Sequence, residues 1–296
     1  MTPLLTIFTA SVRPDLTQFW LACVRRAFPP DEVTIEIFDD SAEGVLRQEL
    51  LPGAVVLRPG PGRRDFQEAY NDALRRALTP WLALLDTDAF AISRDVWPRV
   101  RACFADDAVA AVACAPRTVV EGHDTVALVL KVAAYRAALE AVPDGFLPRV
   151  EREKPGVSPG QWIGHDTGDL LTRAVSDRGG KVALLHLEDA GEFVRFDALT
   201  NVHLFAAWAG PGPLLVIVRR DAYLREGCLG NLALRAVYER TFPGGPPFSF
   251  AISPLAVWTA LASAGPRTLR AALGRARRLR AGARRIGRFL EETPLP

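Results

Sequence analysis

Cysteine and lysine are scarce in this chain, and the cysteines exclude two classes of structure. The four cysteines are scattered, without a close pair or a metal-ligand spacing, so the sequence predicts neither a disulfide framework nor a zinc site. Three of them lie in apolar surroundings and are expected to be small core residues. Lysine occurs only at positions 131, 154 and 181, so arginine carries almost all of the basic charge.

Signals for export and for crossing a membrane are also missing. No uninterrupted apolar run approaches the ~20 residues that a membrane-spanning helix needs. The first residues lack the basic flank and the long apolar region of a signal peptide. We therefore expect a cytoplasmic protein, either free or peripheral on the inner face of the membrane.

What remains is the composition of an ordinary globular protein, with 49% apolar and 24% charged residues and a net charge of +2. Over the first 115 residues, short apolar runs alternate with helical spacing, which predicts a parallel, doubly wound sheet. The predicted strands cover residues 4–9, 34–38, 54–57, 81–85 and 109–114, and the predicted helices cover residues 14–28, 43–50, 66–78 and 96–104.

After residue 115 this alternation loosens. The spacing predicts helices over residues 127–142 and from 161 to about 176, the latter ended by Gly179-Gly180, and a strand over 181–185. Residues 143–160 and 190–250 have the composition of loops.

The most informative stretch is the apolar run at residues 81–85, which leads directly into Asp86-Thr87-Asp88. Such a run is typical of a central strand buried on both faces, and its carboxyl end is where open α/β sheets bind ligands. Two adjacent carboxylates repel each other, and Mg²⁺ or Mn²⁺ would compensate them. The alternative is an acidic turn that caps the next helix.

Two other predicted strands also end in polar residues, Thr9 to Arg13 after the first and Asp39-Asp40 after the second. In a parallel sheet the carboxyl ends lie along one edge, so these residues and Asp86-Thr87-Asp88 are expected to converge there.

With these pieces the chain resembles the GT-A glycosyltransferases, most closely the inverting family 2 type, over about residues 4–190. The parts that carry the resemblance are residues 9–13, 39–41, 71–73 and 86–88, and His165-Asp166 at the start of a helix that ends in Gly179-Gly180. It implies an α/β GT-A fold with a loop-rich acceptor half. The implied catalytic domain covers residues 1–250, divided at about 115, with a helical extension over 251–296.

The resemblance also implies roles for the nucleotide-sugar donor site. Asp39 or Asp40 would accept the imino hydrogen bond of the base, although this carboxylate could instead be the N-cap of the following helix. Asp88 would hold Mn²⁺ or Mg²⁺, with Asp86 toward the ribose or a metal-bound water. The Thr9 loop would contact the donor, and Arg13 or Arg64 would assist the diphosphate, unless these arginines are simply solvated.

For the acceptor site, Asp166 is the candidate base for an inverting displacement, with Asp169 as its rival. His165 stands where the family usually has an acidic neighbour. Asp166 or Thr167 could instead cap the helix. His203 could complete the metal shell or be a structural histidine. Trp162 and Trp208 could stack on an acceptor sugar or belong to the core.

Residues 265–289 carry nine arginines interleaved with apolar residues, the pattern of a basic amphipathic helix. It could lie on an anionic membrane surface, or it could pack on the body or on a partner subunit. We expect no binding of nucleic acid, because base-reading aromatic residues are missing among these arginines.

Three functions compete. The first is a glycosyltransferase that moves a sugar from a nucleotide-diphosphate sugar to an acceptor hydroxyl of a cell-surface glycan, a glycolipid or a small metabolite. The second is a sugar-phosphate nucleotidylyltransferase, but residues 9–15 contain no glycine to cradle a triphosphate. The third is a non-catalytic domain that binds nucleotide sugars or docks on a membrane.

Overall fold

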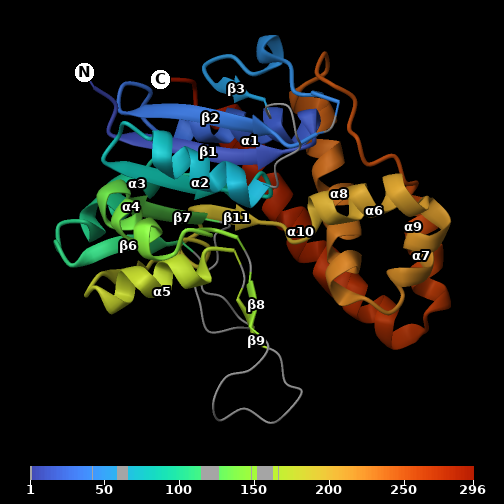
Figure 1. The fold of residues 1–296 in the computed structure, drawn as a ribbon. Helices are drawn as coiled ribbons and strands as arrows, with labels where there is room; N and C mark the ends of the chain where they lie inside the picture. Colours follow the sequence, from blue (N-terminus) through green and yellow to red (C-terminus); the bar gives the residue numbers. More distant parts are fainter. Residues whose placement is uncertain are drawn as a thin grey trace.

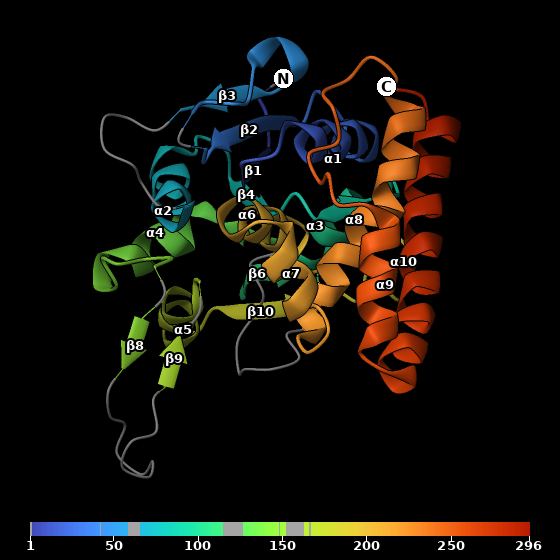
Figure 2. The same ribbon diagram turned by 90° about the vertical axis from the view of Figure 1, so that its right-hand side faces the viewer.

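A computed structural model describes residues 2–41, 43–58, 66–114, 127–147, 149–151, 163–165 and 167–296. A seven-stranded sheet with helices on both faces forms the body, and a group of C-terminal helices stands beside it (Figures 1 and 2).

The strand order of the sheet is β10-β6-β7-β4-β1-β2-β3, and all strands are parallel except β7. This confirms the predicted α/β class with a mostly parallel sheet. The strands are β1 (Leu5–Ser11), β2 (Val33–Asp39), β3 (Val55–Leu57), β4 (Trp81–Leu85), β6 (Val109–Ala113), β7 (Ala127–Lys131) and β10 (Lys181–Leu184).

The central strands are buried on both faces, as their apolar runs predict. Along β1, Ile7 packs into one core and its neighbour Phe8 into the other, because successive side chains point to opposite faces. The first core contains helices α1 (Pro14–Ala27) and α3 (Val96–Cys103). The second contains α2 (Phe66–Arg76), α4 (Val132–Ala141) and α5 (Asp169–Asp177).

The prediction of one helix over residues 127–142 was wrong in its first part. Residues 127–131 form β7, which runs antiparallel between β4 and β6, and α4 begins only at Val132. A short apolar run fits either a strand or a buried helix, so periodicity alone does not separate the two. The short helix predicted over residues 43–50 is limited to a 3₁₀ turn, η1 (Gln48–Leu50).

Two further strand pairs lie outside the main sheet. β5 (Ala89–Ala91) pairs with β11 (Phe193–Arg195), and β8 (Arg149–Glu151) pairs with β9 (Ile163–His165). The helix predicted from residue 161 therefore starts later, at Asp169, and it ends before Gly179-Gly180 as expected. All four cysteines are free thiols, and three of them are buried, which agrees with their predicted place in the core.

The description of residues 190–250 as loop-rich was wrong. The chain there forms α6 (Leu199–Ala209), α7 (Pro211–Ile217) and α8 (Ala222–Thr241), followed by α9 (Pro254–Ser263) and α10 (Pro266–Glu292). Two glycines inside α8 hid this helix in the sequence. A side chain at Gly227 would clash with the carbonyl oxygen of Ala198, so the glycine permits close approach to the start of α6.

The predicted basic helix exists as α10. It packs along α8 (Figure 2) and also contacts α1 and α9. An apolar stripe of α10 is buried, and most of its arginines are exposed. The stripe includes Ala272, Ala276, Leu279, Ala283 and Ile286. Of the alternatives for this segment, the structure has the helix packed on the body of the protein.

Candidate active site

The predicted convergence of acidic strand ends is present at the carboxyl edge of the sheet. Asp40, Asp86 and Asp88 line one cavity of about 580 Å³. The residues around them come from the end of β1, from α2 and from the β4–β5 turn: Ala10, Ser11, Val12, Tyr70 and Thr87. The parallel register, in which Ser11 lies opposite Asp39, sets these loops side by side.

Tyr70 on α2 organises the acidic side of this cavity. Its hydroxyl donates a hydrogen bond of 2.9 Å to Oδ1 of Asp86. Burial raises the pKa of Tyr70 well above its ordinary value, and the nearby charges of Asp86, Asp88 and Asp40 raise it further. Because the phenol stays protonated, it remains a hydrogen-bond donor to Asp86 throughout the neutral range.

Asp39 and Asp40 differ in their surroundings, although the sequence left them as alternatives. Asp39 is fully buried and accepts hydrogen bonds from the backbone amides of Ser41, at 3.1 Å, and Leu46, at 2.9 Å. Its carboxylate therefore fixes the loop after β2. This role is similar to that of an N-cap, because the carboxylate binds backbone amides in both cases. Asp40 is the one that lies on the cavity wall.

Arg13 does not reach the cavity, so its predicted contact with a diphosphate does not fit the structure. Its side chain is fully buried and pairs with Asp15, with Nη2 2.5 Å from Oδ2. The same guanidinium donates to Oδ1 of Asn231 at 2.6 Å and to the carbonyl of Leu199 at 3.2 Å. These contacts tie the start of α1 to α6 and α8.

Asp15 completes this buried cluster. Burial alone would raise the pKa of Asp15, but the charge and hydrogen bonds of Arg13 and the hydrogen bonds from Ser249 lower it below its ordinary value. The pair is therefore ionised, and its role is to hold elements of the fold together. Thr9 is also fully buried and is not part of the cavity wall.

His203 does not join the carboxylates. It is half-buried on α6, where burial and the neighbouring Arg13 lower its pKa. Within the described part of the chain, no group of three or more His, Cys, Asp or Glu side chains is arranged to hold a metal ion. The prediction that His203 completes a metal shell therefore does not fit this arrangement.

The carboxylates that remain still fit the predicted cation. Asp86 and Asp88 supply hard oxygen donors at an open cavity, and Mg²⁺ is commonly bound by one or two carboxylates together with substrate phosphates. The donor set is therefore suited to Mg²⁺ or Mn²⁺ accompanied by a diphosphate, and it is too small for a cation bound by the protein alone.

The remaining wall of the cavity is mostly apolar, and Trp208 is the one residue of it that the sequence singled out. It is built from α6 and the start of α8: Thr200, Asn201, Leu204, Phe205, Trp208 and Leu224. Trp208 is 84% exposed, with its ring centroid 5.9 Å from that of Phe205. This exposure excludes the alternative that Trp208 belongs to the core.

Three of the predicted site residues lie outside the described residues: Arg64, predicted for the donor diphosphate, and Trp162 and Asp166, predicted for the acceptor site. His165 ends β9. Asp169, the rival to Asp166, is the first residue of α5 and is half-buried.

Asn71, next to Tyr70, connects α2 to the start of α5. Its side-chain amide donates to the carbonyl of Asp144 at 2.9 Å and accepts from the amide of Phe146, also at 2.9 Å. The carbonyl of Phe146 in turn accepts from Gly168 at 3.2 Å. Neighbouring positions on α2 thus hold both Asp86 and the turn before Asp169.

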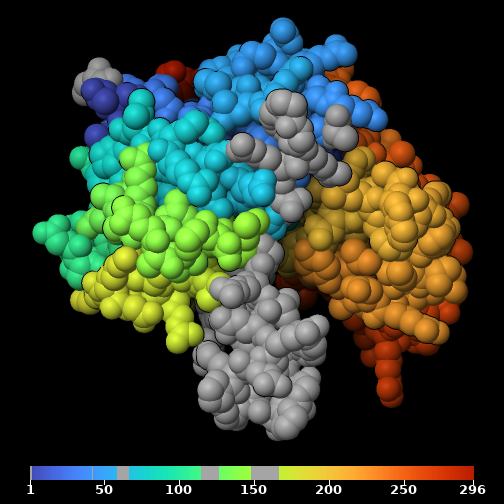
Figure 3. Space-filling model, in the orientation of Figure 1, coloured from blue at the N-terminus to red at the C-terminus, as the bar shows by residue number. Residues whose placement is uncertain are grey.

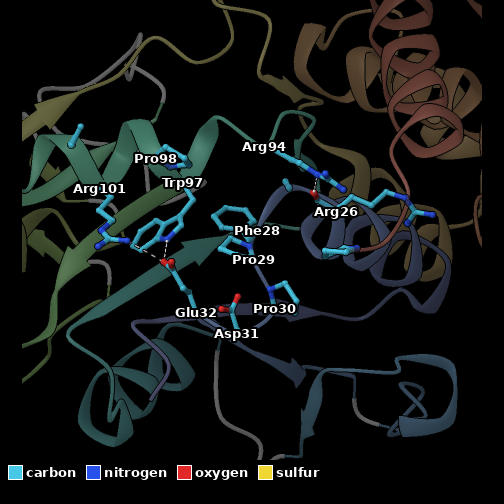
Figure 4. A pocket seen from close by; sticks show the side chains of 13 residues that line it. Arg26, Phe28, Pro29, Pro30, Asp31, Glu32, Arg94, Trp97, Pro98 and Arg101 are labelled. Carbon is cyan, nitrogen blue, oxygen red and sulfur yellow. Dashed lines mark hydrogen bonds and ion pairs between the residues drawn. The ribbon is translucent and has the colours of Figure 1, made fainter. Parts of the chain in front are cut away.

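A larger cavity of about 890 Å³ lies at the opposite end of α1, and none of the predicted site residues that the structure describes lines it. Apolar side chains such as Phe28, Pro30 and Trp97 line it (Figure 4). Its central carboxylate, Glu32, already accepts a hydrogen bond from Trp97 Nε1 at 2.8 Å and pairs with Arg101 at 3.3 Å. We therefore take the acidic cavity as the candidate active site.

No family model matches the sequence, and no curated protein matches it. The chain is similar to the solved structure of a mannosyltransferase from Pyrobaculum calidifontis in complex with GDP-Man and Mn²⁺, with 17% identity, 99% of this chain and 86% of that chain covered, and a TM-score of 0.45. It is also similar to glucosyl-3-phosphoglycerate synthase from Mycobacterium tuberculosis, with 13% identity, 62% of this chain and 69% of that chain covered, and a TM-score of 0.41. A third similar structure is 2-C-methyl-D-erythritol 4-phosphate cytidylyltransferase from Thermus thermophilus, with 18% identity, 62% and 88% coverage and a TM-score of 0.38. Because these TM-scores lie below 0.5, function is inferred from the residues of the cavity.

Proposed function

We propose that the protein is a glycosyltransferase that moves a sugar from a nucleotide-diphosphate sugar to an acceptor hydroxyl. One observation carries the proposal: three carboxylates from two strand ends meet in a cavity whose remaining wall is mostly apolar and includes two aromatic side chains. The acidic side suits a cation and a diphosphate, and the other side suits an acceptor.

On the donor side, Asp88 and Asp86 would hold Mn²⁺ or Mg²⁺, which would neutralise the charge that grows on the departing diphosphate. Tyr70 holds the Asp86 carboxylate in place before any ligand arrives. Asp40, on the cavity wall, is the better placed of the two candidates to accept the imino hydrogen bond of the base.

On the acceptor side, the proposal keeps Asp166 as the base that takes the hydroxyl proton in an inverting displacement, with Asp169 as the rival. Asp169 is the first residue of α5, and the turn before it is held through Asn71 and Phe146. It does not line the acidic cavity, so it stays the second candidate. The acceptor class stays open among a cell-surface glycan, a glycolipid and a small metabolite, with the reaction in the cytoplasm.

Two observations count against a sugar-phosphate nucleotidylyltransferase. The loop after β1 contains no glycine, so its backbone is not suited to close approach by a triphosphate. Arg13, the cation in that loop, is buried in its pair with Asp15.

Release of nucleoside diphosphate from a panel of nucleotide sugars, with and without Mn²⁺, tests the proposal. We expect one donor to be consumed in a metal-dependent reaction that Asp88→Ala abolishes. Asp177→Ala is a matched control, because it also removes an aspartate, and Asp177 is exposed at the end of α5 and does not line the cavity. Binding of a donor without turnover, even with added acceptors, would favour the non-catalytic alternative.

A further inference from the structure

A second functional surface lies on the helices beside the sheet. Residues 198–218, which form α6 and α7, contain no Asp, Glu, Lys or Arg, although these helices lie at the surface of the molecule (Figure 3). A surface helix normally carries charged residues on its solvent side. The absence of charge here therefore needs an explanation other than folding.

Several large apolar side chains of this region are exposed. Trp208 and Leu204 on α6 are 84% and 49% exposed, and Val216 on α7 is 58% exposed. Leu255, which is 76% exposed, lies on α9, a helix that packs against α7. Exposed apolar side chains that gather on neighbouring helices mark contact surfaces for membranes or proteins.

Basic residues flank this apolar surface. Arg219 and Arg220 follow α7 directly and are exposed, and Arg267 and Arg270 are exposed at the start of α10, which packs against α9. Apolar side chains beside arginines match a bilayer with anionic headgroups, because the apolar groups enter the interface and the guanidiniums pair with phosphates. No helix in the described ranges is both long and apolar enough to cross a membrane.

We propose that the surface formed by α6, α7 and α9 docks on an anionic lipid bilayer. Val216 and Leu255 enter the headgroup region, and Arg219 and Arg220 contact lipid phosphates. Because Leu204 and Trp208 also line the acidic cavity, docking brings one wall of that cavity to the membrane surface. The proposal rests on the exposed side chains and does not require the proposed transferase activity.

This surface differs from the one that the arginine-rich sequence predicts. The exposed face of α10 carries arginines such as Arg277 and Arg284, but Leu273 is its one large apolar side chain of high exposure among the described residues. Such a face would attract anionic lipids only by charge, so variants on α10 serve as a control for the apolar surface.

Co-sedimentation of the full chain with lipid vesicles tests the proposal. We expect binding to vesicles that contain phosphatidylglycerol and little binding to pure phosphatidylcholine. Val216→Asp, Leu255→Asp and the double variant R219E/R220E should each weaken binding about tenfold or more, because they remove insertion or reverse charge at the headgroups. The double variant R277E/R284E should change it less than about threefold, since these charges lie away from the contact.

Thermal unfolding and nucleotide binding of each variant verify that the fold and the cavity are intact, because Val216 and Leu255 do not line the cavity. A wild-type protein that ignores both kinds of vesicle would overturn the proposal. So would R277E/R284E abolishing the binding while Val216→Asp and Leu255→Asp leave it unchanged, which would place the contact on α10 instead.

Discussion

The hydroxyl of Tyr70 lies 2.9 Å from Oδ1 of Asp86 and joins α2 to the acidic end of β4. The tyrosine ring is itself fixed, because it is buried in edge contacts with Phe8 and Phe146. Its ring centroid lies 5.7 Å from that of Phe8 and 5.8 Å from that of Phe146. The carboxylate is thus oriented by a rigid donor, as the ligands of metal sites commonly are.

Replacing Tyr70 by Phe should weaken metal-dependent nucleotide binding by about 10- to 100-fold, because the carboxylate loses the donor that orients it. The ring contacts remain, so the free energy of unfolding should fall by no more than about 1–2 kcal/mol. Calorimetric titration with nucleoside diphosphate and Mn²⁺ measures the affinity. Unchanged affinity in Tyr70→Phe would mean that this hydrogen bond does not prepare the site.

Asn71 should be required for the stability of the fold. Asn71→Ala leaves the amide of Phe146 and the carbonyl of Asp144 without their partner, which should cost about 2–3 kcal/mol. Urea denaturation measures this loss. Asp72→Ala is the matched control, since its side chain lies on the same helix and pairs with the exposed Arg75, an ion pair worth under about 1 kcal/mol.

Gly145 should depend on the same contact. Its φ of +61° favours glycine, and a side chain there would clash with the amide of Asn71. Gly145→Ala should therefore destabilise the protein, and the double variant with Asn71→Ala should lose less than the sum of the two single losses. Strict additivity in urea denaturation would contradict this arrangement.

The buried pair of Arg13 and Asp15 should be needed for the fold and not for ligand binding. Asp15→Asn leaves an unpaired buried guanidinium, which should cost about 3–5 kcal/mol. The double variant Arg13→Met/Asp15→Asn removes both charges and should lose less. Its nucleotide affinity should stay near that of the wild type; a loss of affinity without unfolding would return Arg13 to the donor site.

The same pair predicts a direction for acid unfolding. The pKa of Asp15 is lower in the folded state than its ordinary value of 3.8, so the folded state is stabilised at pH above that value. This contribution should be lost as the pH falls below 3.8 through the folded-state pKa. The double variant should therefore show a shallower loss of stability in this range, measured by unfolding at a series of pH values.

The sequence predicted the half of the fold that carries the carboxylates, because its apolar runs and helical spacing are regular there. The acidic edge followed from the same pattern, since parallel strands end together at one side of a sheet. The different surroundings of Asp39 and Asp40, however, depend on hydrogen bonds to the loop after β2, which no local pattern encodes.

The other half depended on tertiary contacts. From the sequence, Arg13 was expected to be a loop cation, because its hydrogen-bond partners at residues 199 and 231 lie far along the chain. Gly227 weakened the helical signal of α8, because it serves close packing against Ala198. Residues 198–218 weakened the signal of α6 and α7, because they contain no charged residue to mark the solvent side of an amphipathic helix. For the same reason, Trp208 was the only residue of the apolar cavity wall that could be proposed from the sequence.

The central claim is tested most directly by thermal unfolding of the wild type and Asp88→Ala with a panel of nucleoside diphosphates and nucleotide sugars, each with and without Mn²⁺ or Mg²⁺. A ligand that binds only the folded state at about 100 times its Kd stabilises it by about 2.7 kcal/mol. We predict a metal-dependent shift for one nucleotide in the wild type and in Asp177→Ala, and none in Asp88→Ala. The absence of a shift with every nucleotide in the wild type would contradict the assignment of this cavity to a nucleotide sugar.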